Sequence, residues 1–402
     1  MGANVTDLFS SLEPQERRVF WVLQKQGPLS KNQLQQITGF KLTTLNRFLR
    51  PLEEKSLVIR SQFGKSSGGR KPALYDVNDR TYYILGADIS RIYMKVVVTN
   101  LKMQVVLSRH FDMEETSTPE WTVKKITEVV KELLLTKVID AKILLAGVGT
   151  VGPMDKPRGM LTSPRYFKAP GWHNVPISML LESTLGCHVA LDNGANTAVL
   201  AESLYGIGCG HDRVLYVNCG MGIRMGTFFD GALIHTAENE EDTFGHMVVN
   251  ADGIRCACGK RGCLDCYASA RAIAENFKRH REAGEGSTLP ANAPWRDICM
   301  AATDDHLAKE MILRAAFYLN VGLSNLIGLL EPGLVILSGP LIQISTLYYQ
   351  TVVKQANLLN YSHKNKTNFH RGGNFKGDAI AVGAAALALE EAIGVNTAIS
   401  HV

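Results

Sequence analysis

The sequence from Gly245 to Cys263 reads Gly-His-Met-Val-Val-Asn-Ala-Asp-Gly-Ile-Arg-Cys-Ala-Cys-Gly-Lys-Arg-Gly-Cys, and it is the most specific feature of the chain. Its candidate metal ligands are three cysteines and a histidine: His246, Cys256, Cys258 and Cys263. Thiolates and imidazole are the donors that Zn²⁺ prefers, and four of them leave no position for a substrate. Gly259 and Gly262 suit a loop that turns tightly around one ion. The stretch therefore predicts a structural zinc site.

Two other interpretations of this stretch stay open. Cysteines also serve as small core hydrophobes, and a buried histidine can simply be hydrogen-bonded, although four cysteines within eleven residues are dense for a core. Cys266 supplies a fourth thiol, and a register in which it replaces one of the ligands is compatible with the sequence.

The size and composition indicate a protein with more than one hydrophobic core. The chain has 402 residues, which is too long for a single core. No apolar run approaches the roughly 20 residues that cross a bilayer, and Asp7 and Glu13 interrupt the N-terminus where a signal peptide would be apolar. The four cysteines outside the cluster are scattered, unlike a disulfide framework. We expect a cytoplasmic protein with no membrane partner.

The basic charge is concentrated at the N-terminus. Residues 1–80 contain 13 Lys and Arg against 7 Asp and Glu, whereas the whole chain has a net charge of +5, so the remainder is close to neutral. A local positive charge on a small domain is what contacts with phosphate groups require. A solvated basic face without a partner is the alternative.

Residues 1–80 have the pattern of a winged helix-turn-helix. Apolar spacing predicts a helix over residues 14–26, a short helix between Ser30 and Gly39 with Ile37 facing inward, and a third helix after Phe40 with Leu42 in its buried stripe. A strand at 57–59, a tip at 62–72 rich in Gly, Ser and basic residues, and a return strand at 73–77 form the wing. Pro51 is expected to kink the third helix.

The exposed face of the third helix and the wing tip carry the side chains that suit DNA recognition. Polar groups on a recognition helix can read base edges in the major groove, and basic groups on a wing can contact phosphates. The predicted DNA-binding residues are Lys41, Thr43, Thr44, Asn46, Arg47, Lys65, Arg70 and Lys71. A winged helix used for protein contacts is the alternative.

The rest of the chain alternates strands and helices. Strands are predicted at 82–89, 93–99, 104–110 and 143–149, with a helix at 120–135, and a similar scheme restarts with a strand at 213–218. This order indicates two related α/β lobes. The apolar segments 311–330 and 378–387 are predicted to be core helices.

Several motifs, taken in order, resemble the ROK family of sugar kinases and sugar-responsive repressors. They are residues 147–155, the Pro170-Gly171-Trp172 turn, residues 192–196, the glycines from Gly220, residues 244–249 and residues 256–265. With the N-terminal winged helix, the resemblance is to ROK transcriptional repressors of the xylose or N-acetylglucosamine repressor type. It implies a two-lobed actin-like ATPase fold and a structural zinc at the four residues named above.

We therefore predict an α/β protein with three parts. These are a winged helix-turn-helix DNA-binding domain at 1–80, a first α/β lobe at 81–200, and a second α/β lobe at 201–402 with the zinc loop and C-terminal helices.

The kinase motifs of the family are altered in this chain. Residues 88–92 read Asp-Ile-Ser-Arg-Ile where the kinases have Asp-x-Gly-Gly-Thr, and residues 220–224 read Gly-Met-Gly-Ile-Arg, so no ATP binding is expected. Gly194 occupies the position of the catalytic Asp, which takes the proton from the attacking sugar hydroxyl. Asp192, two positions earlier, is the one carboxylate that could replace it. The chain is expected not to be an enzyme, and no catalytic residue is assigned.

The sugar pocket that the resemblance implies is altered as well. The aligned ligand-binding positions are Asn193, Thr243, His246 and Asp265, so that two carboxylates of the family are missing and one is shortened. These residues are expected to hold a sugar; the alternative is that they only support the zinc loop.

Together these features predict a sequence-specific transcriptional regulator, a repressor of carbohydrate-utilisation genes that a sugar or sugar phosphate gates. Its expected partners are double-stranded operator DNA, the effector and further copies of itself in a homodimer or tetramer, since half-sites about one helical turn apart call for paired readers. Two alternatives stay open: an active sugar kinase with an added DNA-binding domain, and a regulator controlled by a protein partner.

Overall fold

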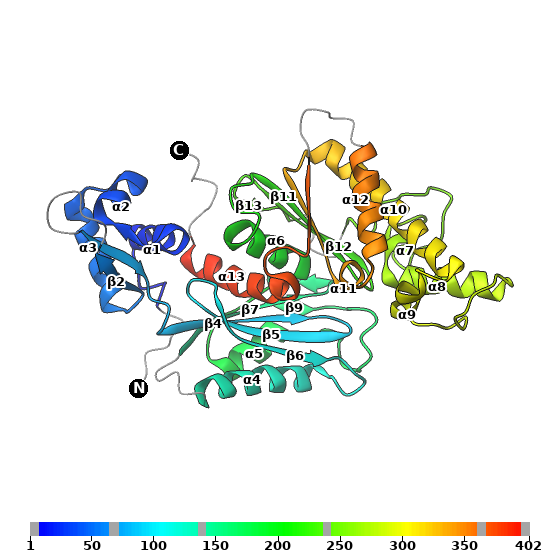
Figure 1. Cartoon of the computed structure of the whole chain (residues 1–402). Coiled ribbons are helices and arrows are strands. Elements are labelled where there is room, and N and C mark those ends of the chain that lie inside the picture. The colour runs from blue at the N-terminus through cyan, green and yellow to red at the C-terminus, as the bar shows by residue number, and fades with distance from the viewer. Residues whose placement is uncertain (1–7, 64–71, 136–141, 236–242, 360–366, 395–402) are drawn as a thin grey trace. The chain divides into compact units, whose positions relative to one another are not determined.

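The computed structural model describes residues 8–63, 72–135, 142–235, 243–359 and 367–394. The chain divides into two compact units. Unit 1 comprises residues 1–205 and 380–402, and unit 2 comprises residues 206–379. The two units are described separately below (Figure 1).

The N-terminal part of unit 1 is a three-helix winged fold. Its elements are α1 (Pro14–Gln26), β1 (Leu29–Ser30), α2 (Lys31–Thr38), α3 (Leu42–Glu54), β2 (Val58–Phe63) and β3 (Ala73–Val77). The three strands form a sheet in the order β1-β3-β2. The Ser30 hydroxyl accepts a hydrogen bond from the Gln33 amide at the start of α2, and Gly39 ends this helix with a φ of 74°. The two-residue strand β1 was not predicted.

Two residues of this fold lie differently from the prediction. Ile37 and Leu42 are 39% and 41% exposed, because the core between α2 and α3 is completed by residues one or more turns away, such as Leu34 and Leu45, which are fully buried. Pro51, which was expected to kink the third helix, lies within α3, and the helix continues to Glu54. A proline this close to the C-terminus of a helix removes a single backbone hydrogen bond.

The remainder of unit 1 is built on a five-stranded sheet in the order β10-β7-β4-β5-β6. Its strands are β4 (Tyr82–Ile89), β5 (Tyr93–Asn100), β6 (Val105–Asp112), β7 (Lys142–Thr150) and β10 (Val189–Asn193). β4, β5 and β6 pair antiparallel, whereas β7 runs parallel to both β4 and β10. A short hairpin of β8 (Met154–Asp155) and β9 (Met160–Leu161) follows β7.

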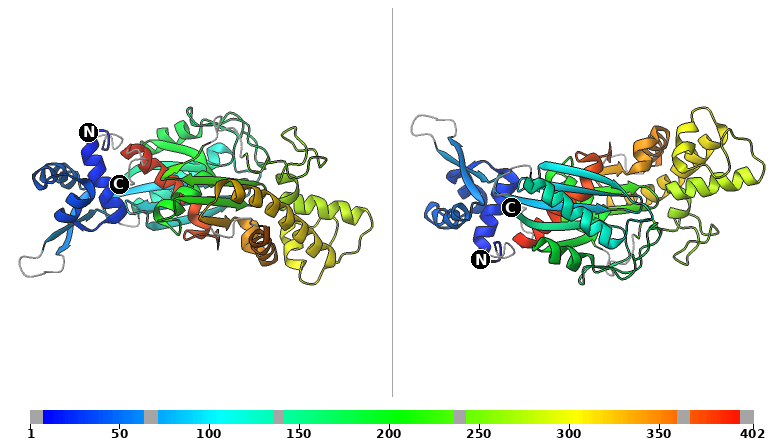
Figure 2. Two further views of the ribbon diagram at one scale, coloured as in Figure 1. Left: turned by 90° about the horizontal axis from the view of Figure 1, so that it is seen from above. Right: turned by 90° about the horizontal axis from the view of Figure 1, so that it is seen from below.

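Helices cover both faces of this sheet. α4 (Pro119–Leu135) and α5 (Ile177–Leu185) pack on one face over alternate strand residues such as Leu85 and Val148, and the view from below in Figure 2 looks onto α4. α6 (Gly194–Tyr205) and α13 (Ala379–Ile393) lie on the opposite face (Figure 1).

Glycines let α13 approach the sheet closely. A Cβ at Gly86 or Gly147 would lie 1.9 Å from the carbonyl oxygen of Ala381 or Ala384, so no larger residue fits. This packing places the C-terminal helix in unit 1 from Ile380 onward. The compact units thus differ from the predicted parts, in which residues 201–402 form one lobe. The difference arises because α13 buries its small residues against the first sheet, a long-range contact.

Unit 2 is built on a second five-stranded sheet in the order β13-β12-β11-β14-β15. Its strands are β11 (Arg213–Cys219), β12 (Ile223–Phe229), β13 (Ala232–Leu233), β14 (Leu334–Ser338) and β15 (Asn368–Arg371). Its helices are α7 (Asp265–Ala268), α8 (Ala270–Glu282), α9 (Trp295–Ala301), α10 (His306–Leu330), α11 (Pro340–Ile344), α12 (Thr346–Leu359) and the short η2 (Lys376–Asp378).

The long helix α10 organises the core of unit 2. It contributes Ile312, Leu319 and Leu323 to the same buried cluster as Leu215 and Val335 of the sheet, in agreement with the prediction of a core helix. Its length and composition also meet the criteria for a membrane span, and half of its most apolar window is buried within the protein.

Candidate functional site

The loop between β13 and α7 brings the four predicted zinc ligands together. Within this loop the Gly259 amide donates to the Cys256 carbonyl (3.0 Å) and the Gly262 amide donates to the Ile254 carbonyl (2.8 Å). Gly259 and Gly262 have φ angles of +94° and +73°, and a Cβ at Gly262 would lie 1.6 Å from the Asn250 carbonyl oxygen. Both glycines are therefore required by the turns that bend the loop around its cysteines.

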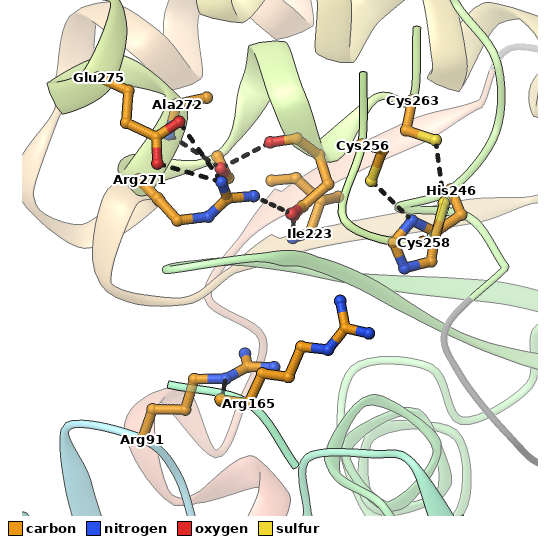
Figure 3. Close-up of polar contacts among 12 residues, drawn as sticks. Arg91, Arg165, Ile223, His246, Cys256, Cys258, Cys263, Arg271, Ala272 and Glu275 are labelled. Atoms are coloured by element: carbon orange, nitrogen blue, oxygen red, sulfur yellow. Dashed lines mark hydrogen bonds and ion pairs between the residues drawn. The ribbon is translucent and has the colours of Figure 1, made fainter. Parts of the chain in front are cut away.

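The donor atoms of the four residues have a spacing that fits one tetrahedral ion. The nitrogen of His246 and the sulfurs of Cys256, Cys258 and Cys263 lie within 4.8 Å of one another. Cys256 Sγ is 3.6 Å from His246 Nδ1, and Cys258 Sγ is 3.6 Å from Cys263 Sγ (Figure 3). Ligands about 2.0–2.3 Å from a tetrahedral ion are separated by roughly 3.3–3.8 Å. The group can hold a metal ion.

Two of these thiols differ in their acidity. Burial opposes ionisation of Cys256, but hydrogen bonds from Cys258, Cys263 and Cys266 outweigh it and lower the pKa of Cys256 to about 7. Burial raises the pKa of Cys263 well above its ordinary value. A metal ion has to displace the proton from each thiol that it binds. Of these two thiols, Cys256 loses its proton more readily than Cys263.

Among the residues that the structure describes, Cys266 is not one of the four side chains of the metal group. It is buried in α7, where burial raises its pKa to about 12. The arrangement favours the register with Cys256, Cys258 and Cys263.

Two tyrosines that were not predicted from the sequence support the loop. The Tyr267 hydroxyl accepts a hydrogen bond from the Ile254 amide (2.6 Å), and the Tyr267 ring stacks on Tyr318 of α10 at a centroid distance of 4.2 Å. A Cβ at Gly253 would lie 2.0 Å from the Tyr267 hydroxyl oxygen. The tyrosines lie 51 positions apart in the chain, so no local pattern points to the pair.

Asp265, a predicted sugar ligand, is held by protein groups. One carboxylate oxygen accepts from the Ile223 amide (2.8 Å) and the other accepts from Arg271 (2.7 Å). Arg271 also pairs with Glu275 (Figure 3). Arg271 was not predicted, although it lies on α8 only six residues after Asp265. Asp265 thereby ties the start of β12 to α8.

The other predicted sugar ligands are divided between the two units. Thr243 is exposed and its carbonyl accepts from the His246 amide (3.2 Å) in unit 2. Asn193 lies at the end of β10 in unit 1. Its Oδ1 accepts a hydrogen bond from the Ala195 amide (2.8 Å) at the start of α6. His246 is shared with the metal group.

Gly194, the residue expected at the position of the kinase catalytic base, is the first residue of α6. Gly194 follows β10 directly, and a Cβ there would lie 3.2 Å from the Ile380 side chain. Asp192 is 3% exposed and its Oδ2 lies 2.5 Å from the Lys156 ammonium group. Its Oδ1 accepts from the Asn193 amide and from the Asn196 side chain. Both oxygens of this carboxylate are thus bound to protein groups.

The segment at the position of the kinase phosphate loop is a tight turn between β4 and β5. The Ser90 amide donates to the Tyr93 carbonyl (2.9 Å) across the turn. Arg91 donates from Nε to the backbone carbonyl of Arg165 (2.8 Å) in unit 1 (Figure 3). A bulky cation thus occupies the turn where the kinases have glycine.

The predicted base-reading residues lie on α3 or at its N-cap. Lys41, Thr43, Asn46 and Arg47 are exposed and Thr44 is half-buried. The Asn46 side chain accepts from Lys31 of α2, and the Arg47 guanidinium lies over the Phe48 ring at 4.9 Å. Lys65, Arg70 and Lys71 of the wing tip lie outside the described residues.

Comparison with known proteins gives the same assignment for most of the chain. The model of the ROK family matches residues 84–391. The chain is 26% identical to the xylose repressor of Bacillus subtilis (strain 168) over 322 residues, which are 79% of this chain and 80% of that protein. It is 38% identical to the glucokinase of Thermotoga maritima over 139 residues, 33% of this chain and 43% of that one.

Solved structures show the fold. A ROK family transcriptional regulator, described as a homolog of the E. coli MLC protein, superposes with a TM-score of 0.77 at 21% identity over 94% of this chain and 96% of that one. A ROK glucokinase from Streptomyces griseus, solved with glucose and AMPPNP, superposes with a TM-score of 0.62 at 23% identity over 76% of this chain and 99% of that one. The actin-like fold of sugar kinases is thus confirmed, and with a family match over well more than half of its length the chain belongs to the ROK family.

Proposed function

We propose that this protein is a sequence-specific DNA-binding transcriptional repressor of carbohydrate-utilisation genes, gated by a sugar or sugar phosphate. The observation that carries the proposal is the union of a winged helix with a kinase-type lobe in which Gly194 stands at the base position and Lys156 holds the neighbouring Asp192. The similarity to xylose repressors over four fifths of their length supports it.

DNA binding is assigned to the winged helix. The side chains proposed to read base edges are Lys41, Thr43, Thr44, Asn46 and Arg47, and those proposed to contact phosphates are Lys65, Arg70 and Lys71. The exposed face of a single helix reaches few base pairs. We therefore propose that the protein acts as a homodimer or tetramer on a two-fold operator, in the cytoplasm and without a membrane partner.

The metal group is proposed to bind Zn²⁺ in a structural role. His246, Cys256, Cys258 and Cys263 would hold the ion, and with four protein ligands it would cross-link the loop without activating water. Asp265 follows Cys263 by two residues and is bound to β12 and α8. The ion would therefore also fix the loop against the sheet of unit 2.

The effector is proposed to bind near the positions of the kinase sugar site. Asn193, Thr243, His246 and Asp265 are the candidates, and Asp265 contributes only if it exchanges one of its present partners. D-xylose is the first effector to test, because two relatives carry it in their names. We also propose that the protein binds no ATP and catalyses no reaction, because the turn at Ser90 and Arg91 stands where the kinases have their phosphate loop.

An active sugar kinase with an added winged helix is the second candidate, favoured by the similarity to glucokinases. One experiment separates the two. Purified protein is titrated onto a duplex from its own upstream region, with D-xylose, glucose, N-acetylglucosamine and their phosphates added in turn, and a coupled assay follows ATP turnover. The repressor is expected to bind DNA, to release it with one sugar and to turn over no ATP. Sugar-dependent ATP turnover would support the kinase, and tight DNA binding indifferent to every sugar would point to control by a protein partner.

A further inference from the structure

A buried lysine connects the winged helix to two helices of the lobe. Lys25 lies in the last turn of α1, and its side chain is 10% exposed. Its ammonium group is 2.8 Å from Glu390 Oε1 of α13, whose side chain is 13% exposed. It also donates to the hydroxyl of Tyr205, at the end of α6, and lies 3.8 Å from the centroid of the Tyr205 ring.

The tyrosine closes the network. Its hydroxyl lies 3.1 Å from Glu390 Oε1 and 3.3 Å from Gln24 Oε1. Three elements that are far apart in the sequence thus meet at one ammonium group, and Figure 2 shows the end of α13 beside α1 from above. Burying a charge costs free energy unless its partners lie at hydrogen-bonding distance with good geometry. The three helices therefore satisfy Lys25 in one relative position.

The two helices that hold Lys25 are also the elements at the two chain crossings between the units. α6 ends at Tyr205, the last residue of the first segment of unit 1, and the chain enters unit 2 at Gly206. α13 begins at Ala379, the last residue of unit 2, and returns the chain to unit 1. A rotation of one unit against the other has to be absorbed at or next to these helices, because they are the covalent connections.

Besides the Gln24–Tyr205 contact, the winged helix also contacts elements that are not at a chain crossing. Gln24 donates to the Leu101 carbonyl (3.1 Å) and Lys102 pairs with Asp76 of β3 (2.6 Å). Leu101 and Lys102 lie in the turn between β5 and β6, which belongs to the sheet and not to a chain crossing. These contacts attach the winged helix to the lobe, whereas Lys25, together with Oε1 of Gln24, attaches it to the connecting helices.

We propose that Lys25 is a positioning residue that couples the orientation of the winged helix to the connecting helices α6 and α13. A change at the chain crossings moves Tyr205 or Glu390 and thereby displaces the end of α1. Coupling to an effector rests on the proposed function; the docking of α1 onto these two helices does not.

The test compares two variants and a matched control in the full-length protein. Lys25→Met removes the ammonium group and keeps the length of the side chain, and Glu390→Gln removes the opposite charge and keeps its shape. Lys168→Met is the control, because Lys168 pairs with Glu114 at the surface, where the two side chains are 49% and 60% exposed.

Two readouts separate coupling from docking. Hydrogen exchange of residues 22–26 and 201–205 reports docking, and we expect it to accelerate by about tenfold in Lys25→Met and Glu390→Gln and to stay unchanged in the control. The ratio of the DNA dissociation constants with and without D-xylose reports coupling. It is expected to approach one in both variants, while the dissociation constant for D-xylose itself stays within about twofold of the wild type.

Unchanged exchange in both variants would overturn the proposal, and so would a wild-type ratio in Lys25→Met. A wild-type protein that ignores D-xylose and the other sugars above would count against the proposed function instead, and the exchange data alone would then decide whether Lys25 docks α1 on the connecting helices.

Discussion

The ammonium group of Lys156 lies 2.5 Å from Oδ2 of Asp192, two residues before Gly194. The Asp192 side chain is 3% exposed and its other oxygen accepts two further hydrogen bonds. The carboxylate that is nearest in sequence to Gly194 therefore has a structural role, which is consistent with a regulator derived from a kinase fold.

Restoring the missing carboxylate is not expected to restore catalysis. In Gly194→Asp the new side chain has to displace Ile380, since a Cβ there would lie 3.2 and 3.3 Å from two of its carbons, and the Ser90–Arg91 turn still lacks the glycines of a phosphate loop. We expect no sugar-dependent ATP turnover in a coupled assay with glucose or xylose. Measurable turnover in this variant would show that the phosphate sites are functional.

Removing the partner of Asp192 is expected to destabilise the protein. Lys156→Met leaves a buried carboxylate with one strong donor fewer, a loss of about 1–3 kcal/mol in the free energy of unfolding. Urea denaturation followed by circular dichroism measures the difference. Lys168→Met removes an exposed ion pair and is expected to change the same quantity by no more than about 0.5 kcal/mol. Equal effects of the two substitutions would contradict a structural role for Lys156.

Metal content provides a direct test of the zinc site. Purified protein is expected to contain one zinc ion per chain by elemental analysis, and Cys258→Ser or Cys263→Ser to contain much less, because loss of one ligand opens the coordination shell. Chelation is expected to lower the melting temperature, since an ion that binds only the folded state stabilises it. Cys266→Ser is the matched control and should retain zinc. Loss of zinc in Cys266→Ser with retention in Cys258→Ser would reassign the ligands.

The acid side of the stability curve depends on Asp305, which caps α10. Burial opposes ionisation of this carboxyl, but hydrogen bonds from Ser287, the Ala308 amide and Thr288 outweigh it and hold its pKa well below its usual range. A depressed folded-state pKa adds stability above the unfolded value of about 3.9, and this stability is lost as the pH falls toward the folded value.

Asp305→Ala is therefore expected to lower the free energy of unfolding at pH 7 by about 1–2 kcal/mol. The difference in the free energy of unfolding between Asp305→Ala and the wild type should become smaller as the pH falls below about 4. Urea denaturation at several pH values measures both effects. Asp304→Ala changes an exposed neighbour and serves as the control. A difference for Asp305→Ala that is independent of pH would exclude an ionised cap.

DNA affinity is expected to depend on Arg47 without a change in folding. Its side chain is 70% exposed and its distance to Glu13 is 3.9 Å, too long for a strong ion pair. Arg47→Ala should weaken operator binding by about tenfold or more in fluorescence anisotropy, at an unchanged melting temperature. Arg158→Ala, in which a side chain 77% exposed is removed from the β8–β9 hairpin, should bind like the wild type. Equal losses in both variants would indicate a general effect of charge.

The elements of the winged helix were predictable because their signals are local. Gln26 ends α1 just before Gly27-Pro28, Ser30 caps α2, and β3 covers residues 73–77 as predicted. Ile37 and Leu42 were not predictable in the same way. Helical periodicity places a residue on one side of its own helix, but only the packing of a second helix decides whether that side is covered at that turn.

The helices of the winged fold, the first strands of the unit 1 sheet and the cluster of metal-binding side chains could be predicted from the sequence alone, because capping residues, apolar periodicity and cysteine spacing act within a few positions of the chain. The order of the motifs indicated the family. The folded structure was needed to identify the partners of the buried charges: Asp265 with Arg271, Asp192 with Lys156, and Lys25 with Glu390. It also decided that α13 packs in unit 1, where Gly86 and Gly147 leave space for it. Such contacts join residues up to hundreds of positions apart, and their stability depends on burial and geometry that no local pattern encodes.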